Sequence, residues 1–365
     1  MIAGMRVLHV VATTQRRGAE IFAADLVHAL DGLGPAQQVA SLRPARGPSV
    51  DFDAPTHTLG GGGLSAGRLR RLVRRLRPDL IQAHGGEAMK ISVLAHPGTP
   101  IVYRRIGGAP PALRKGWRRV GYQQLVRRTA RVVAVAEAVR RESMLLLKIP
   151  PARIVTIPNA VDVHRLIAYA DPSVTRKELG IESGAPVVLS MGALTWEKDP
   201  PVLLRVAAEA LRRLPDAVYV VLGDGPMRSR MEAEVSFLGL QDRVRMLGTR
   251  TDVPDLLSMA DVLLFASRPD GMEGMPASLI ESGMLVTPSV AYDVAGVSEV
   301  VIDGKTGRLV PWGEERTLAD ALVNLLVDGV TRSAMGDATR ERCLGEFSIE
   351  SVAPRYLELY REVLM

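Results

Sequence analysis

The chain has 365 residues, of which 47% are hydrophobic and 24% charged, a composition that excludes a disordered or fibrous protein and fits a globular one. Its apolar runs fall short of the roughly 18 residues that a membrane span needs, and its start lacks the pattern of a signal peptide. The single cysteine, Cys343, excludes an internal disulfide. We therefore expect a cytoplasmic protein, and the length predicts two domains.

Positive charge is concentrated in the first half of the chain. Residues 1–170 contain 26 Lys and Arg against 10 Asp and Glu, whereas residues 171–365 contain 20 against 30. The halves therefore carry +16 and −10. A charge difference of this size predicts an anionic partner or surface for the first half.

Two series of short apolar runs, separated by helical stretches, are typical of buried strands. The first series is "RVLHVVA" (6–12), "DLIQAH" (79–84), "PIVYRR" (100–105), "RVVAVA" (131–136) and "RIVTIPN" (153–159). After a charged, Pro-containing break at about 162–186 come "PVVLSMG" (186–192), "AVYVVLGDG" (217–225), "RVRMLG" (243–248), "DVLLFAS" (261–267) and "TPSVAY" (287–292). This alternation predicts an α/β protein with two Rossmann-like, doubly wound domains facing one another. Ligands would then bind beyond the carboxyl ends of the strands.

Two arginine-rich stretches of the first half are predicted to be helical. In "RLRRLVRRLRPD" (68–79) the apolar residues Leu69, Leu72, Val73 and Leu76 lie at i, i+3, i+4 and i+7, with arginines on the other face. That face is either simply solvated or attracted to a membrane or an anionic acceptor. In "LRKGWRRVGYQQLVRR" (113–128) Trp117 is flanked by basic residues, which suits the headgroup level of an anionic membrane.

The segment "DGMEGMPASLIE" (270–281) places two glutamates after a strand. Pro276 fits the first turn of a helix, where its missing N–H has no partner to lose. Glu273 would lie at the start of that helix, and Glu281 about one and a half turns inside it. An isolated pair of this kind is commonly solvated, so the surrounding sequence decides whether it forms a site.

Three strand-to-helix turns have the composition of anion-binding loops. In "TTQRRGAE" (13–20) the N–H groups of Gly18 and Ala19 can approach an anion. "MGALTWEKDP" (191–200) brings Lys198 to the start of a helix, and "LGDGPMRSRME" (222–232) is a further Gly-rich turn. Each motif is weak alone.

Taken together and in order, these motifs resemble the retaining glycosyltransferases of family 4, which have the GT-B fold. The matching pieces also include "IPNAVD" (157–162), "VRMLGTRTDVPDLLSMADVLLFAS" (244–267), "EGMPASLIE" (273–281) and "GVSEVVIDGKTGRLVP" (296–311). The resemblance implies an acceptor-binding domain over residues 1–165 and a donor-binding domain over residues 166–346. It also implies that "FSIESVAPRYLELYREVLM" (347–365) is a terminal helix that crosses back to the first domain.

The resemblance assigns roles to individual residues. In the family, two glutamates spaced like Glu273 and Glu281 lie near the donor sugar and at the ribose hydroxyls. Catalytic roles are implied for Glu273, Lys198 and His84, and acceptor binding for Arg104, Arg105 and His84. Donor-binding roles are implied for Gly18, Ala19, Lys198, Gly223, Leu247, Gly274, Met275, Pro276, Ala277, Ser278 and Glu281.

The chain departs from the family pattern at three places. Ala193 stands where the family often has an arginine, Val286 stands where a glycine is usual, and no histidine follows the strand at 100–105. Lys198 would then hold the diphosphate alone, or with help from Arg16, Arg17, Arg104 or Arg105.

The implied reaction is transfer of a sugar, with retention, from a nucleoside-diphosphate-sugar to an acceptor hydroxyl. UDP is favoured over GDP, and the implied setting is biosynthesis of a cell-surface polysaccharide, glycolipid or glycoconjugate. Catalysis would rest on electrostatic stabilisation of the departing diphosphate, without a metal or other cofactor. "DFD" (51–53) lies in a Pro-rich loop and is not expected to bind a metal.

The resemblance and the positive charge of the first half together predict the partners of the protein. We expect a glycan, lipid-linked or small-molecule acceptor and peripheral association with the anionic inner face of the membrane. One alternative is a sugar-nucleotide epimerase or hydrolase of the same fold. Another is a nucleic-acid-binding protein using the basic half, although the 4% aromatic content offers few stacking platforms, so that no nucleic acid is expected.

Overall fold

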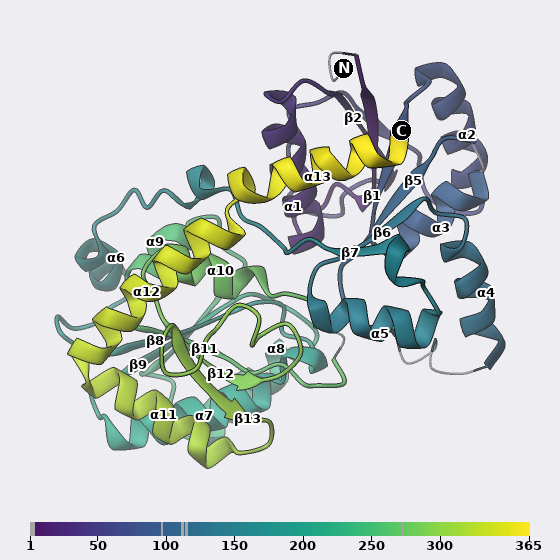
Figure 1. Cartoon of the computed structure of the whole chain (residues 1–365). Coiled ribbons are helices and arrows are strands. Elements are labelled where there is room, and N and C mark those ends of the chain that lie inside the picture. Colours follow the sequence, from purple (N-terminus) through teal and green to yellow (C-terminus); the bar gives the residue numbers. More distant parts are fainter. Residues whose placement is uncertain (1–3, 96–97, 111–112, 114–115, 272) are drawn as a thin grey trace. The chain divides into compact units, whose positions relative to one another are not determined.

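The structure is a computed structural model that describes residues 4–95, 98–110, 113, 116–271 and 273–365 (Figure 1). The chain divides into two compact units. Unit 1 comprises Met1–Asp162 together with Phe347–Met365, and unit 2 comprises Val163–Glu346.

Unit 1 contains a seven-stranded parallel sheet in the order β3-β2-β1-β4-β5-β6-β7. Its strands are β1 (Arg6–Thr13), β2 (Ala36–Arg43), β3 (Thr56–Thr58), β4 (Leu80–His84), β5 (Ile101–Arg105), β6 (Arg131–Ala134) and β7 (Ile154–Thr156). Its helices are α1 (Gly18–Asp31), α2 (Ser65–Leu76), α3 (Gly85–Ala95), α4 (Gly116–Val126), α5 (Glu137–Leu147) and α13 (Ile349–Leu364), with a 3-10 turn η2 (Pro151–Arg153). Helices α2 to α5 contact one another in sequence, and Figure 1 shows α2, α3 and α4 along one side of the unit.

The last helix of the chain belongs to the core of unit 1. Helix α13 packs against α1, and Tyr356 and Tyr360 join Phe22 in one buried apolar cluster. The Tyr360 hydroxyl also donates a hydrogen bond to the side-chain oxygen of Gln82 on β4, at 3.0 Å. Burial of two tyrosines secures the terminal helix, because burying one large apolar side chain contributes about 1.5–3 kcal/mol.

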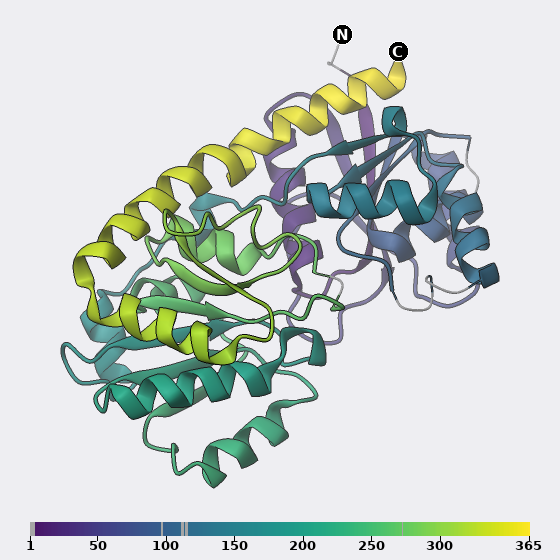
Figure 2. The ribbon, with the colours of Figure 1, turned by 60° about the horizontal axis from the view of Figure 1, so that its bottom comes forward.

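Unit 2 contains a six-stranded parallel sheet in the order β10-β9-β8-β11-β12-β13. Its strands are β8 (Val187–Met191), β9 (Val218–Leu222), β10 (Val244–Gly248), β11 (Val262–Phe265), β12 (Ser289–Asp293) and β13 (Gly307–Pro311). Its helices are α6 (Pro172–Glu178), α7 (Pro200–Arg213), α8 (Arg228–Phe237), α9 (Val253–Ser258), α10 (Ala277–Met284), α11 (Glu315–Val327) and α12 (Gly329–Phe347), with 3-10 turns η3 (Val163–Leu166) and η4 (Trp196–Lys198). Helices α7 and α11 lie side by side (Figure 2).

Both sheets have the strand order of a doubly wound nucleotide-binding fold, in which the winding reverses beside the first strand. The reversal lies between β1 and β4 in unit 1 and between β8 and β11 in unit 2. At such a point the helices that follow neighbouring strands lie on opposite faces of the sheet, which leaves room for a ligand at the carboxyl ends. The fold therefore predicts ligand-binding residues in the loops after β1, β4, β8 and β11.

The structure reproduces all ten apolar runs as strands and adds β2, β3 and β13, which the sequence did not indicate. The amphipathic stretch at 68–79 lies in α2 and in the turn after it, with Leu69, Leu72 and Val73 buried. Arg114 and Lys115 of the second basic stretch lie outside the described residues. No helix of the described residues is long and apolar enough to cross a membrane.

Candidate active site

The loops after β8 and β9 in unit 2 are bonded to each other through their backbones. Gly192 donates to the carbonyl of Leu222 and Leu194 donates to that of Asp224, both at 2.9 Å. Gly223 has φ +135°, and a Cβ at this position would overlap the carbonyl oxygen of Gly192. Glycine is therefore required at Gly223, and the two loops form one rigid rim.

Lys198 and Glu273 form the charged centre of unit 2. The Lys198 ammonium group is paired with Glu273 Oε2, and the Ser267 hydroxyl donates to the same oxygen at 2.7 Å. The ammonium nitrogen also lies 4.9 Å from the centroid of the Phe265 ring. The side chains of Lys198 and Glu273 are 27% and 15% exposed, so both are partly buried.

Glu273 is held in its ionised form. Burial alone would raise the pKa of its carboxyl, but the charge of Lys198 and the hydrogen bonds from Lys198, Ser267 and the Gly274 N–H lower it more. The pKa of Glu273 therefore lies below its usual value. At neutral pH the centre consists of one cation and one anion in contact.

The N-terminus of α10 follows this pair directly. Pro276 is the N-cap residue of α10, one position earlier than the first-turn position expected from the sequence, and the helix begins at Ala277. The preceding loop is fixed by Gly296, which has φ +81° and whose Cβ would overlap the carbonyl oxygen of Gly274. The N–H groups of the first helical turn give this loop the positive character that attracts anions.

Glu281 lies further along α10 and is paired with Arg165 of η3. The Arg165 guanidinium donates to Glu281 Oε1 at 3.1 Å, and the two side chains are 24% and 12% exposed. Arg165 therefore fixes the orientation of the carboxylate. An ionised carboxylate accepts several hydrogen bonds, so one such bond leaves further acceptor capacity for hydroxyl groups.

In unit 1, Gly18 and Ala19 form the first turn of α1, after the N-cap residue Arg17. A Cβ at Gly18 would meet nothing within 4 Å, so the space beside this turn is open. Glu20 in the same turn is buried, and burial raises the pKa of its carboxyl although the charges of Arg17 and Arg104 oppose the shift.

His84, at the end of β4, belongs to a buried chain of hydrogen bonds. Gln37 donates its amide to the Pro35 carbonyl at 3.0 Å, so its oxygen faces His9 Nε2, 2.6 Å away. His9 Nε2 must then donate, and its neutral ring accepts at Nδ1 from His84 Nε2 at 3.1 Å. Burial lowers the pKa of His9 to about 4 and the pKa of His84 well below its usual value. His84 is therefore neutral and presents Nδ1 as an acceptor with no partner among the described residues.

Arg104 and Arg105, at the end of β5, are buried and have partners within unit 1. Arg104 donates to the side-chain oxygen of Asn159 at 2.7 Å and stacks on the Phe22 ring, 3.6 Å from its centroid. Arg105 forms an ion pair with Glu142 at 2.8 Å. Both fix local structure, and their assignment to acceptor binding stays a prediction.

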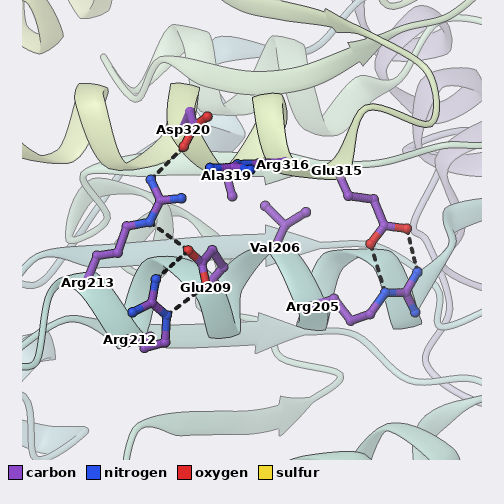
Figure 3. A pocket seen from close by; sticks show the side chains of 9 residues that line it. All are labelled: Arg205, Val206, Glu209, Arg212, Arg213, Glu315, Arg316, Ala319 and Asp320. Carbon is purple, nitrogen blue, oxygen red and sulfur yellow. Dashed lines mark hydrogen bonds and ion pairs between the residues drawn. The ribbon is translucent and has the colours of Figure 1, made fainter.

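A cavity with a volume of about 770 Å³ lies elsewhere in unit 2, between α7 and α11 (Figure 3). Its charged residues mostly neutralise one another: Arg205 pairs with Glu315, and Arg213 pairs with both Glu209 and Asp320. None of the residues that the sequence selects lines it. A smaller pocket does include Lys198, together with the ends of β8, β9 and β11.

The residues selected from the sequence thus fall into two groups, one in each unit. Unit 2 holds Lys198, Gly223, Leu247 at the partly exposed end of β10, the 273–278 loop and Glu281. Unit 1 holds Gly18, Ala19, His84, Arg104 and Arg105.

Sequence reasoning missed two contributors to the site. Ser267 is the last residue of the apolar run "DVLLFAS" (261–267), and its position at the carboxyl end of a predicted strand could have indicated a site residue. Arg165 lies 116 positions from Glu281 in the chain, and no local pattern indicates their contact.

Two protein-family models match the chain and together span most of it. Residues 16–165 match "Glycosyltransferase Family 4", and residues 173–342 match "Glycosyl transferases group 1". Among curated relatives, the lipopolysaccharide core biosynthesis glycosyltransferase LpsE of Rhizobium meliloti is 28% identical over 94% of this chain and 95% of its own length. The alpha-D-kanosaminyltransferase of Streptomyces kanamyceticus is 30% identical over 65% of this chain, and the match spans only 62% of that relative's length.

Solved structures show the same fold. The Anabaena protein HepE in complex with UDP-glucose superposes with a TM-score of 0.85, at 20% identity, over 98% of this chain and 100% of that one. Similarity at this level of identity concerns the fold alone. It confirms the predicted α/β architecture with two Rossmann-like units and a terminal helix that belongs to the first of them.

Proposed function

The chain belongs to glycosyltransferase family 4, and from this premise we propose that it transfers a sugar from a nucleoside-diphosphate-sugar to an acceptor hydroxyl with retention at the anomeric carbon. The observation that carries the proposal is the arrangement on unit 2 of the Lys198–Glu273 pair, the N-terminus of α10 and Glu281. Together these groups offer a cation, a helix terminus and an oriented carboxylate, which are the partners that a diphosphate and a ribose require.

In this proposal the diphosphate binds Lys198 and the first turn of α10. Negative charge grows on the leaving diphosphate as the glycosidic bond breaks, and fixed positive groups around it stabilise the transition state more than the ground state. Lys198 and α10 supply that charge, so the scheme requires no metal or other cofactor. The leaving phosphate assists deprotonation of the acceptor, and Glu273 keeps the Lys198 ammonium group aimed at it.

Glu281 is proposed to accept hydrogen bonds from the ribose hydroxyls of the donor. Arg165 holds one carboxylate oxygen, which removes rotational freedom before the ligand arrives and lowers the entropic cost of binding. Gly223 and Leu247, at the ends of β9 and β10, would border the base. We favour UDP as the nucleotide, since HepE, the structural neighbour described above, was solved with UDP-glucose.

Unit 1 is proposed to bind the acceptor. His84 is neutral and presents an unpartnered Nδ1 acceptor at the end of β4, which suits a hydrogen bond from a sugar hydroxyl. Arg104 and Arg105, which are buried at the end of β5, would support the residues that contact the acceptor. The names of two relatives, a lipopolysaccharide core biosynthesis glycosyltransferase and a 2-deoxystreptamine N-acetyl-D-glucosaminyltransferase, favour a glycan or a small-molecule acceptor. The charged surface of unit 1 favours an acceptor at an anionic membrane.

Calorimetric titration with UDP, GDP and UDP-glucose tests the donor half of the proposal. Wild-type protein should bind UDP more tightly than GDP, and Glu281→Ala should weaken UDP binding about 10- to 100-fold, because hydrogen bonds to a charged group contribute about 1.5–3 kcal/mol. Glu182→Ala, at an exposed position of unit 2, is the matched control. Unchanged UDP affinity in Glu281→Ala would refute the ribose assignment.

A coupled assay separates transfer from the alternatives. Release of UDP from UDP-glucose should depend on an added acceptor, and NMR of the product should show an anomeric configuration equal to that of the donor. Acceptor-independent release would indicate a hydrolase or epimerase instead.

A further inference from the structure

A second cavity of unit 2, with a volume of about 480 Å³, is lined by aromatic rings and carboxylates that the proposed reaction does not use. Its wall includes Trp196 from η4, Trp312 after β13 and Tyr292 from β12. The side chains of Lys198 and Glu273 are not part of this wall. The volume falls within the range of small-molecule sites, about 300–1,000 Å³.

The two tryptophans present open ring surface to the cavity region. Trp196 and Trp312 are 44% and 46% exposed. The guanidinium carbon of Arg268 lies 5.9 Å from the centroid of the Trp196 ring and 5.7 Å from that of Trp312. Arg268 thus links residues from three separate loops into one wall, and both rings keep exposed area on which a ligand can stack.

Tyr292 adds a polar group that has no partner. Its side chain is 1% exposed, and its hydroxyl makes no hydrogen bond to any described residue. Asp199 and Glu315 line the same cavity as Tyr292, and burial, followed by the charges of these two carboxylates, raises the pKa of Tyr292 to about 12. A buried hydroxyl without a hydrogen-bond partner is destabilising, so a ligand that bonds to it recovers this energy.

Most charges of the cavity are paired, because two of its three arginines bind carboxylates and only Arg230 forms no ion pair with a described residue. Arg205 and Glu315 form a two-bond ion pair at 2.8 and 2.7 Å, visible in Figure 3. Arg268 pairs with Asp270 at 3.0 Å and with Asp199 at 3.6 Å. Carboxylates next to aromatic rings accept hydrogen bonds from hydroxyl groups, whereas they repel an anion.

We propose that this cavity is a carbohydrate-binding subsite that holds one or two pyranose rings of a glycan. The apolar C–H face of a pyranose would stack on Trp312 or Trp196, and its hydroxyls would bond to Tyr292, Asp199 and Glu315. This subsite lies within unit 2 and is distinct from the donor groups at Lys198 and Glu281. A glycan held there would remain bound to the protein between transfer events.

Tryptophan fluorescence offers a direct measurement, because the chain has three tryptophans and two of them lie at this cavity. In a Trp117→Phe background only Trp196 and Trp312 emit. Titration with maltose, cellobiose and N,N′-diacetylchitobiose should give, for at least one disaccharide, a saturable change in emission. Tyr292→Phe should weaken that binding by up to about 10-fold, the value of one hydrogen bond, and Trp312→Ala should abolish it.

Controls separate this proposal from the proposed donor site. Circular dichroism checks that each variant is folded, and UDP affinity should be unchanged in Trp312→Ala, whereas Glu281→Ala should keep its saccharide binding. Saccharide binding without UDP binding would leave the subsite standing and refute the donor assignment. The subsite is refuted if no disaccharide gives a saturable response, if Trp312→Ala responds like its parent, or if only a nucleotide such as AMP saturates the signal.

Discussion

At the scale of single residues, the proposed role of Lys198 in binding a diphosphate depends on its ion pair with Glu273. The carboxylate of Glu273, itself held by Ser267, fixes the position of the Lys198 ammonium group. In the proposed reaction a diphosphate therefore binds a cation that is already oriented, which is the condition for strong electrostatic catalysis.

Lys198→Ala should lower turnover by about 10²–10³-fold, the usual effect of removing one electrostatic donor from a transition state. Steady-state kinetics with UDP-glucose would measure this, and Lys305→Ala, at an exposed position of unit 2, serves as the control. The substitution also leaves Glu273 without its cation, so the pKa of Glu273 should rise. Near-normal turnover in Lys198→Ala would remove this residue from the mechanism.

The His9–His84 pair should make unit 1 sensitive to mild acid. Both folded-state pKa values lie below the usual 6.5, so between pH 6.5 and about 4 the unfolded chain binds more protons than the folded one. Stability should therefore fall as the pH drops through this window, by up to about 1.4 kcal/mol per pH unit for each histidine. The carboxylate of Glu273 also contributes to the stability of the folded protein, because its pKa is lowered there. That contribution is lost only below about pH 4.5, at lower pH than most of the histidine effect.

Hydrogen-exchange mass spectrometry of peptides from β1 and β4, at pH 7 and pH 5, would measure the loss. His84→Gln removes one of the two titrating rings and keeps an amide that can donate to His9, so the pH dependence should shrink by about half. His28→Gln, at an exposed position with no such contact to β4, is the control. An unchanged pH dependence in His84→Gln would show that the pair does not set acid stability.

At the scale of secondary-structure elements, the turn after α10 carries backbone strain at Val286. This residue has φ +65°, a left-handed conformation that costs an L-residue roughly 1–2 kcal/mol and suits β-branched side chains least. The structure thus accounts for the family's glycine at this position. Val286 is nevertheless held closely, because a Cβ at Gly336 of α12 would overlap its carbonyl oxygen.

Val286→Gly should stabilise unit 2 by about 1 kcal/mol, since glycine adopts this conformation without strain. Differential scanning calorimetry should show a melting temperature higher by about 2–4 °C. Gly336→Ala should act in the opposite direction, because its methyl group meets the Val286 backbone. A lower melting temperature for Val286→Gly would mean that the contacts of the valine side chain outweigh the strain.

Ten of the thirteen strands could be predicted from the sequence, and β2, β3 and β13 could not. Strands such as β8 and β9, which read "VVLSM" and "VYVVL", are buried on both faces, so their sequences are nearly continuous apolar runs. Strand β2 reads "AQQVASLR" and β13 reads "GRLVP", with polar residues that weaken the apolar pattern. Strand β3 has three residues and lies at a sheet edge, where pairing with one neighbour defines it rather than its own composition.

The residues of the candidate site could likewise be predicted only in part from the sequence. The family resemblance, supported by local spacing, selected Glu273, Glu281 and Lys198. Lys198 and Glu273 lie on strand-to-helix connections and Glu281 lies in the helix that follows, which a linear reading can recognise. Their partners Arg165 and Ser267 became visible only when the chain was folded. Contacts between distant segments depend on tertiary packing, and propensity and periodicity contain no information about them.

At the scale of the whole molecule, the surplus of positive charge belongs mostly to unit 1. On α2 the side chains of Arg70, Arg71, Arg74 and Arg75 are exposed, and none of them forms an ion pair with a described residue. Helix α3 contacts both α2 and α4, and Trp117 at the start of α4 is 79% exposed. Helices α2 and α4 of unit 1 therefore carry exposed arginines and an exposed tryptophan.

This surface should bind anionic membranes. Each Lys or Arg near an anionic leaflet contributes about 1 kcal/mol, and a tryptophan at the headgroup level adds a further apolar contribution. In co-sedimentation assays the protein should bind vesicles that contain phosphatidylglycerol and not vesicles of phosphatidylcholine alone. Binding should weaken as salt rises above 0.1 M, where the Debye length falls below about 10 Å.

Charge reversal on α2 provides the decisive comparison for this prediction. Arg71→Glu with Arg75→Glu should reduce vesicle binding about tenfold or more, because two attractive charges become repulsive. Lys177→Glu with Arg316→Glu changes the net charge of the chain equally at exposed positions of unit 2. If the surface of unit 1 is responsible, this second pair should have a much smaller effect, and Trp117→Ala should weaken binding even at high salt. Equal losses of vesicle binding for both pairs of substitutions would show that binding follows net charge alone. If wild-type protein binds both vesicle types equally, or binds neither, membrane recruitment is refuted and a soluble acceptor is favoured.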